Sequence, residues 1–168
     1  MHLRKLREED AEGMLEWMHE SDAQEHFRFN SEAMTRADAV FFIQHSFSET
    51  VQHYAIADDS DDHYLGTVSL KDIDRKNGTA EYAISLRSSA RQKGFGTEAT
   101  KRILRIAFKE LRLHRVWLTV VDNNTAACLM YEKCGFRLEG IMRDHLLIHG
   151  ERRNWKIYGI LAEEYAGE

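Results

Sequence analysis

The sequence predicts a mixed α/β (α+β) fold, in which about four helices flank a mostly antiparallel central sheet of about seven strands. Two observations support this. Strand-like segments dominate up to about residue 87, and strand–helix–strand–helix–strand patterns then follow to about residue 162. With 168 residues, 43% of them hydrophobic, the chain is long enough to bury its own core. We therefore expect a single domain over residues 1–168.

The first part of the chain combines a short strand with two amphipathic helices. A strand is expected at residues 2–7, followed by a helix at 9–19 whose apolar residues recur at helical spacing. Residues 20–34 are irregular and rich in polar and aromatic side chains. A capping-box pattern that begins at Thr35 then predicts the second helix.

Three strands are expected next, at about residues 51–57, 63–71 and 79–87. Asn77-Gly78, between the last two, is typical of a hairpin turn because both residue types tolerate a positive φ. In the third of these strands apolar residues alternate with polar ones, which places Glu81 on the face opposite Tyr82.

Helices and strands alternate in the second half. The patterns predict an amphipathic helix at 96–112, an apolar strand at 116–121 that is covered on both faces, and a helix at 125–134. Gly135 is placed to end that helix in the left-handed conformation. A final pair of strands, at about 136–148 and 152–162, turns at His149-Gly150.

Composition excludes several classes of protein. Lys and Arg total 23 against 28 Asp and Glu, so the formal charge of −5 disfavours binding to nucleic acid through bulk charge. The apolar runs are too short for a transmembrane span, so no membrane partner is expected. The chain starts without a signal-peptide core, and its two cysteines, Cys128 and Cys134, are expected to be reduced in a cytoplasmic protein.

No metal site is predicted. The nine histidines show no close paired spacing, whereas zinc needs three or four converging ligands. The acidic run Asp58-Asp59-Ser60-Asp61-Asp62 is interpreted as a solvated turn. Cation binding there remains an alternative, although the run lacks the glycine and the distal glutamate of a calcium loop.

The segment Arg91-Gln92-Lys93-Gly94-Phe95-Gly96-Thr97 joins a predicted strand to a predicted helix. Its glycines allow a tight turn and a close approach to a ligand. Unpaired amides at the helix N-terminus, together with the helix dipole, favour an anion such as a phosphate, and Arg91 and Lys93 add positive charge. An ordinary strand-to-helix turn remains the alternative, because the spacing differs from that of the common nucleotide loops.

A second segment, Asn124 to Phe136, follows the apolar strand directly. Together the two segments resemble the GNAT superfamily of acetyl-CoA-dependent N-acetyltransferases. The family's phosphate loop, Gln/Arg-x-x-Gly-x-Gly/Ala, is matched by Arg91, Gly94 and Gly96. Its later motif, Asn followed after six residues by Tyr-Glu-x-x-Gly-Phe, is matched by Asn124, Tyr131, Glu132, Gly135 and Phe136. The residues around Ile148-His149-Gly150-Glu151 are similar to the branch that contains ribosomal-protein N-terminal and spermidine acetyltransferases.

The resemblance, over about residues 2–162, implies a single N-acetyltransferase domain that uses acetyl-CoA and releases CoA. It implies that the amides of residues 91–97 hold the pyrophosphate and that the backbone of Ile84, Ser85 and Leu86 pairs with the pantetheine arm. It also implies that Asn124 contacts this arm, and Lys133 is a further candidate near the phosphates. Ala127 departs from the family pattern, where serine is common, so one polar contact is expected to be missing.

The implied reaction is direct attack of an amine on the thioester carbonyl. An alkyl amine with a pKa near 10 is mostly protonated at pH 7, so a base or a water relay must remove a proton. Glu81 is the candidate base, and Tyr131 is the implied acid that protonates the departing thiolate. Two alternatives stay open: Glu81 as a cross-strand charge partner, and Tyr131 as a packed core side chain.

The expected acceptor is a small amine, a polyamine, an amino sugar or a protein N-terminus. It is expected between residues 20–34 and the hairpin at 143–155, with Glu20, Asp22, Glu25 and His26 on one side and Arg143, His145 and Trp155 as further candidates. A non-catalytic acetyl-CoA sensor is the alternative function. A homodimer formed by strand-edge pairing, which is common in the resembled family, stays open.

Overall fold

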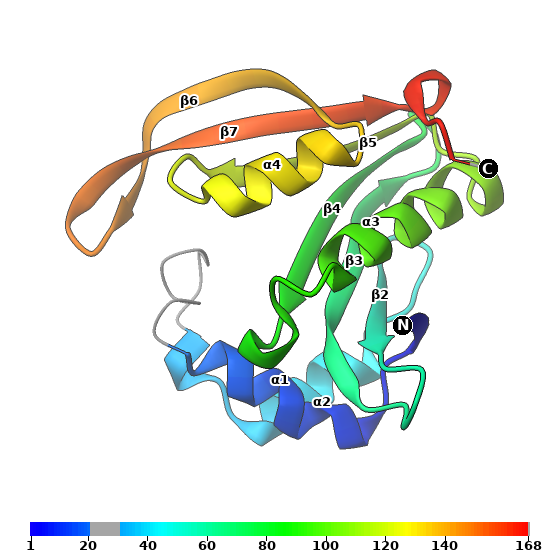
Figure 1. The fold of residues 1–168 in the computed structure, drawn as a ribbon, viewed down its shortest axis with the longest axis vertical. Coiled ribbons are helices and arrows are strands. Elements are labelled where there is room, and N and C mark those ends of the chain that lie inside the picture. The colour runs from blue at the N-terminus through cyan, green and yellow to red at the C-terminus, as the bar shows by residue number, and fades with distance from the viewer. Residues whose placement is uncertain (21–30, 168) are drawn as a thin grey trace.

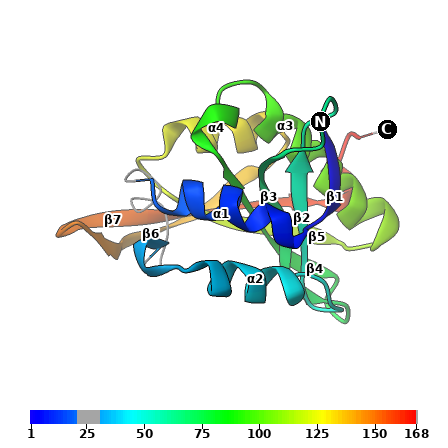
Figure 2. The same ribbon diagram turned by 90° about the horizontal axis from the view of Figure 1, so that it is seen from below.

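The computed structural model describes residues 1–20 and 31–167, and these residues build one seven-stranded sheet with helices on both faces (Figures 1 and 2). The strand order is β1-β2-β3-β4-β5-β7-β6, and all neighbours are antiparallel except β4 and β5, which are parallel. The strands are β1 (His2–Lys5), β2 (Gln52–Ala57), β3 (Tyr64–Asp74), β4 (Thr79–Leu86), β5 (Arg115–Val121), β6 (Arg137–Ile148) and β7 (Glu151–Leu161). The predicted mixed sheet is confirmed.

The described residues contain four α-helices: α1 (Ala11–Met18), α2 (Arg36–Gln44), α3 (Phe95–Arg105) and α4 (Thr125–Lys133). Short 3-10 turns lie at Glu8–Asp10, Ser31–Ala33, Ser88–Ala90 and Ala162–Glu164. The capping box at Thr35 is confirmed, because its hydroxyl accepts from the Asp38 amide and the Asp38 carboxylate accepts from the Thr35 amide. None of the helices in these residues has the length and apolar character needed to cross a membrane.

Two local predictions need correction. The helix expected at 96–112 leaves the α conformation after Arg105 and continues as one π-helical turn, Ile106–Glu110, in which the Leu111 amide donates to the Ile106 carbonyl at 2.9 Å. The β3–β4 connection is longer than a two-residue hairpin. Only Gly78 of its predicted turn pair has a positive φ, of 67°. The strand register shifts between Lys71 and Asp74, and the Asp74 side chain accepts from the Asn77 amide within the turn.

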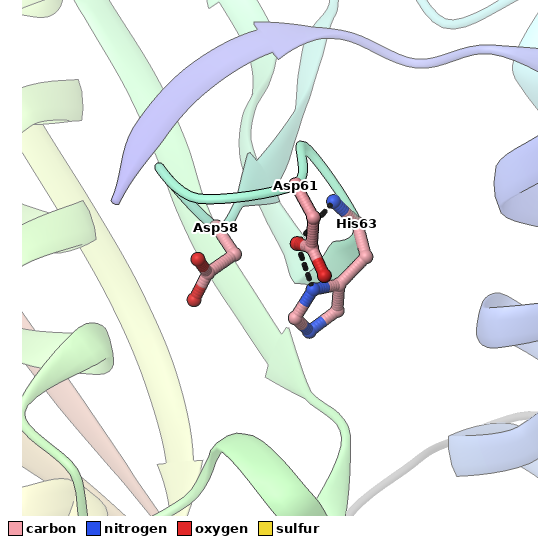
Figure 3. A group of neighbouring side chains, drawn as sticks. All are labelled: Asp58, Asp61 and His63. Carbon is pink, nitrogen blue, oxygen red and sulfur yellow. Dashed lines mark hydrogen bonds and ion pairs between the residues drawn. The ribbon is translucent and has the colours of Figure 1, made fainter.

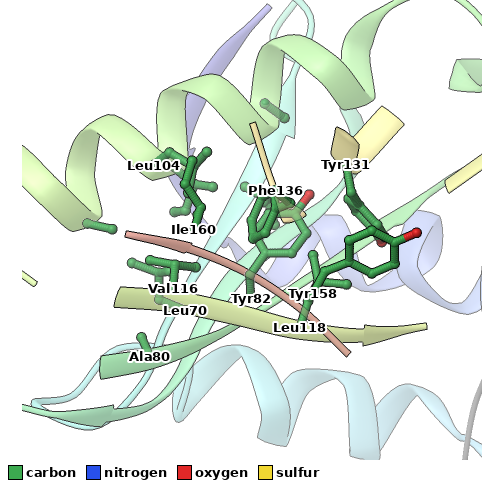
Figure 4. Packing of buried hydrophobic residues seen from close by; sticks show 14 of the residues in the cluster. Leu70, Ala80, Tyr82, Leu104, Val116, Leu118, Tyr131, Phe136, Tyr158 and Ile160 are labelled. Carbon is green, nitrogen blue, oxygen red and sulfur yellow. The ribbon is translucent and has the colours of Figure 1, made fainter. Parts of the chain in front are cut away.

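Separate hydrophobic cores cover the two faces of the sheet. Figure 4 shows the larger core, where Leu104 of α3 and Tyr131 of α4 lie above side chains of β4, β5 and β7. The smaller core packs α1 and α2 against the other face, around Met14, Trp17 and Tyr64. Because both faces are covered, the central strands are anchored and their ends can support a site.

The sheet is incomplete between β4 and β5. Their pairing covers only Thr79–Glu81 opposite Arg115–Trp117. Beyond these residues β4 still pairs with β3 as far as Leu86, and β5 still pairs with β7 as far as Val121. The two strands therefore separate within an otherwise continuous sheet, and the backbone groups of β4 on that side are left for another partner.

Candidate active site

A cleft of about 470 Å³ opens where β4 and β5 separate. It runs from the loop before α3, past the end of β4, to α4. Its lining includes these predicted cofactor residues: Ile84, Ser85, Leu86, Arg91, Gln92, Gly94, Gly96, Thr97 and Asn124. Three other predicted residues do not line it. Lys93 and Lys133 are exposed, and Phe95 packs against the larger core.

The loop before α3 has the backbone shape of an anion site. Gln92 and Gly94 have φ values of 60° and 85°, and α3 starts directly afterwards. The Glu98 amide donates to the Gly94 carbonyl at 3.1 Å, which closes the first helical turn. The amides that precede Glu98 have no acceptor within the helix, so one end of the cleft carries free donors and the positive end of the helix dipole.

Arg91 is engaged by the protein itself. Its Nε donates to the Leu86 carbonyl at 3.1 Å, and its Nη2 lies 2.8 Å from Oε2 of Glu20. Glu20 also accepts from the Ser88 amide at 3.3 Å. Glu20, which was expected to attract the acceptor, therefore joins the end of α1 to the loop before α3. The charge of Arg91 is largely balanced, and its side chain shapes the loop.

A larger cavity of about 770 Å³ lies next to the cleft. Both share the same five lining residues, Trp17, Ile84, Ser85, Asn124 and Tyr131. The two spaces therefore meet at the point where β4 and β5 separate. Ligands in the cleft and in the cavity would therefore share this wall.

Tyr131 is both a core residue and part of this junction. Its side chain is only 7% exposed and makes edge-on contacts with Tyr82 and Phe136, with ring centroids 5.8 and 5.9 Å away (Figure 4). Burial raises the pKa of its phenol well above 10. The phenol is therefore neutral at pH 7 and holds a proton that it can donate.

Asn124 combines a structural role with a place at the junction. Its Oδ1 accepts from the Ala127 amide at 3.2 Å and so caps the N-terminus of α4. This cap leaves the donors of its side-chain amide available to the cavities it lines. An Asn directly before a helical pattern is itself a sequence signal for such a cap.

Glu81 lies on the wall of the larger cavity in a row of polar side chains. Lys71 stands opposite it in the β3–β4 register, with Nζ 3.1 Å from Oε2 of Glu81. On the adjacent strand pair, Nδ1 of His53 lies 2.6 Å from Oγ of Ser69. The cross-strand charge pair considered for Glu81 is thus present in the cavity. Strand alternation groups Ser69 with Lys71 on this face, whereas no sequence pattern singles out His53.

His53 predicts a loss of stability in mild acid. Burial, followed by the nearby charge of Lys71, lowers its pKa from 6.5 to about 4. Between these values the unfolded chain binds a proton that the folded chain does not, so stability falls as pH falls from about 6.5 to about 4, by at most about 3 kcal/mol. Denaturant unfolding at pH 7 and pH 4.5 should show a smaller loss for His53→Gln than for the parent.

The matched control is His114→Gln, because that side chain is exposed. The His114→Gln variant should lose as much free energy of unfolding between pH 7 and pH 4.5 as the parent does. The assignment to His53 is wrong if both variants lose the same stability between pH 7 and pH 4.5 as the parent does.

The other predicted acceptor residues fall into three groups. Trp155 lines the larger cavity and stacks on His145, with ring centroids 5.2 Å apart. Arg143 is exposed and is not part of the lining. Asp22, Glu25 and His26 lie outside the described residues.

The acidic run forms the exposed turn between β2 and β3. Figure 3 shows Asp58, Asp61 and His63, which bring potential ligand atoms within 4.8 Å of one another. Local hydrogen bonds account for this arrangement, because Asp58 accepts from Ser60 and Asp61 accepts from His63. We therefore assign no metal to the turn.

A family profile described as "Acetyltransferase (GNAT) domain" matches residues 1–137. This chain belongs to the GNAT acetyltransferase family. The family consists of acyltransferases that use acetyl-CoA, and the cleft fits this cofactor: it has free amides at one end and an open strand edge along one side.

Two relatives illustrate the match. The chain is 34% identical over 110 residues to the SPbeta prophage-derived uncharacterized N-acetyltransferase YokL of Bacillus subtilis. The aligned residues make up 66% of this chain and 62% of YokL. It is 31% identical over 110 residues to the spermidine N(1)-acetyltransferase of Vibrio cholerae. The aligned residues make up 66% of this chain and 64% of that enzyme. The match thus spans less than two thirds of each relative.

Among solved structures, spermidine N-acetyltransferase from Vibrio cholerae in complex with CoA and spermine is similar with a TM-score of 0.89. The two share 24% identity over 98% of this chain and 96% of the other. At this identity the likeness establishes the GNAT fold. The spermidine relative agrees with the branch that the sequence resembles.

Proposed function

We propose that this chain transfers an acetyl group from acetyl-CoA to a primary amine by direct attack of the amine. The observation that carries the proposal is the junction between the cleft and the larger cavity at Ile84, Ser85, Asn124 and Tyr131. A cofactor in the cleft and an acceptor in the cavity share this wall. Direct transfer needs such a contact, because the reacting atoms must approach to about 3–3.5 Å.

The chain's own residues account for cofactor binding. The amides of the loop before α3 hold the phosphates, and the open edge of β4 at Ile84–Leu86 offers backbone partners to an extended arm. The side-chain amide of Asn124 adds a polar contact at the junction. When bound, acetyl-CoA supplies an acetyl group that is activated as a thioester.

Glu81 acts as the general base and Tyr131 as the general acid. At pH 7 only about one alkyl amine in a thousand is neutral, so the amine must lose a proton before it attacks. Glu81 accepts that proton, directly or through a water, and Lys71 fixes the position of its carboxylate at 3.1 Å. The buried phenol of Tyr131 donates a proton to the sulfur as the carbon–sulfur bond breaks, and it regains a proton from the nitrogen that has become bonded to the acetyl carbon. Glu81 releases its proton to solvent, so both residues return to their starting state.

The test is CoA release from acetyl-CoA in the presence of single amines: spermidine, an amino sugar, an arylalkylamine and a short peptide with a free N-terminus. We expect release above background with at least one of them. Release with none, although acetyl-CoA binds in the micromolar range, would contradict catalysis and support the sensor alternative. Absence of acetyl-CoA binding would contradict both.

A further inference from the structure

We propose that the acceptor is an amine joined to an apolar body, either an aromatic ring or a branched aliphatic group, and not a polycation. This inference rests on the proposed function and specifies its acceptor. It starts from the chemistry of the larger cavity, whose lining comes from segments far apart in the sequence.

Large apolar residues from separate parts of the fold line this cavity. One part of the lining comes from α1, Met34 and α2, and another part comes from the β6–β7 hairpin. The side chains are Met14, Trp17, Met18, Met34 and Phe42 in the first part and Leu146, Leu147, Ile148 and Trp155 in the second. An apolar group that covers these residues loses water contact, which favours its binding.

The described residues give the wall of this cavity a balanced charge. In the wall that the described residues form, Glu81 is the one carboxylate and Lys71 the one ammonium group. They lie 3.1 Å apart, so together they contribute no net charge. A polyamine would carry several ammonium groups into this space, where the described wall offers one carboxylate, and that carboxylate already has a partner. Burial of unmatched charges is costly, so such a ligand is disfavoured.

Hydrogen bonding holds Trp17 in place in the apolar wall, beside the junction with the cofactor cleft. Its Nε1 donates to the Tyr64 hydroxyl at 3.1 Å, and that hydroxyl lies 2.7 Å from Oγ1 of Thr67. The indole is therefore held beside the junction with the cofactor cleft, where the amine must be presented. The neighbouring methionines can adapt to different apolar shapes, because their side chains are flexible.

The volume agrees with an acceptor larger than a simple alkyl amine. At about 770 Å³, the cavity falls in the range that holds drug-sized ligands. Methylamine would leave most of the apolar wall in contact with water. An arylalkylamine, or a peptide N-terminus with a large apolar first side chain, would cover it.

The experiment compares kcat/KM for 2-phenylethylamine, methylamine and spermidine at saturating acetyl-CoA. We expect the aryl amine to exceed both of the others by at least about tenfold, the scale of discrimination that an apolar pocket provides. Two tripeptides, with Leu or Gly at the N-terminus, separate a free amine from a peptide as the source of the apolar group. A preference for spermidine overturns this inference and leaves the proposed function standing. Absence of turnover with every amine overturns both.

A pair of variants tests whether the apolar wall causes the preference. Leu147 is 62% exposed at the cavity wall and Phe41 is 64% exposed on α2 outside the cavity lining, so glutamate is tolerated at either position. Leu147→Glu should lower kcat/KM for 2-phenylethylamine about tenfold and raise the relative rate with spermidine. Phe41→Glu adds the same charge outside the cavity. It should leave kcat/KM for 2-phenylethylamine and the relative rate with spermidine within about twofold of the parent values. The inference is wrong if Leu147→Glu leaves the ratio of the two amines unchanged.

Discussion

Substitution of Tyr131 by phenylalanine is expected to lower kcat about 100-fold while the Kd for acetyl-CoA stays within about twofold. The ring keeps its contacts with Tyr82 and Phe136, so the fold and the cleft wall are preserved. What disappears is the neutral phenol that holds a proton at the junction of the two cavities. Steady-state rates of CoA release and calorimetric titration with acetyl-CoA measure the two quantities separately.

Tyr158→Phe is the matched control for this variant. Tyr158 belongs to the same aromatic cluster, with its ring centroid 6.4 Å from that of Tyr131, and lines neither cavity. Its hydroxyl donates to Glu132 at 2.9 Å, so the substitution should reduce stability by about 1 kcal/mol and leave kcat nearly unchanged. Equal losses of kcat in the two variants would assign the effect to packing and contradict the acid role of Tyr131.

Gly94→Ala is expected to weaken acetyl-CoA binding about tenfold. Gly94 has a φ of 85°, which costs an L side chain about 1–2 kcal/mol. A Cβ at this position meets no atom within 4 Å, so the cost is conformational and involves no clash. The ligand-free loop can relax to relieve this strain, whereas the amides must return to the strained shape to bind phosphates. Calorimetry with acetyl-CoA measures the difference.

Gly140→Ala serves as the control, because Gly140 also has open space around its Cβ position but has no positive φ. It lies on β6, outside both cavities. The Gly140→Ala variant should bind acetyl-CoA with the affinity of the parent. If Gly94→Ala also binds with parental affinity and unfolds at parental denaturant concentration, then the loop does not use this backbone shape to hold the cofactor.

Local patterns predicted the elements of the fold well, because each has a local physical cause. The capping box at Thr35 starts α2, and Gly135 ends α4 with a φ of 96°. Alternation along β4 correctly separated Glu81 from the buried Tyr82. The predictions failed in two places: after Arg105, where the helix continues as a π-helical turn, and at the β3–β4 connection, where the strand register shifts after Lys71.

The site was predictable only in part, because it depends on contacts between distant segments. The motifs placed Gly94, Asn124 and Tyr131 on the cleft wall. No local pattern shows that β4 and β5 stop pairing after Glu81, and this separation creates the cleft. Likewise, Glu20 reaches Arg91 across 71 residues, so its role in shaping the loop could be seen only in three dimensions.

Transfer of isotope-labelled acetyl from acetyl-CoA tests the central claim most directly. The chain is mixed with labelled acetyl-CoA and the best acceptor amine, the reaction is stopped within one turnover, and the chain and the amine are each examined by mass spectrometry. Because the cleft and the larger cavity meet at Tyr131, we expect the label on the amine nitrogen and none on the chain. Label that passes first to a side chain, or that reaches no amine, would contradict direct transfer at this junction.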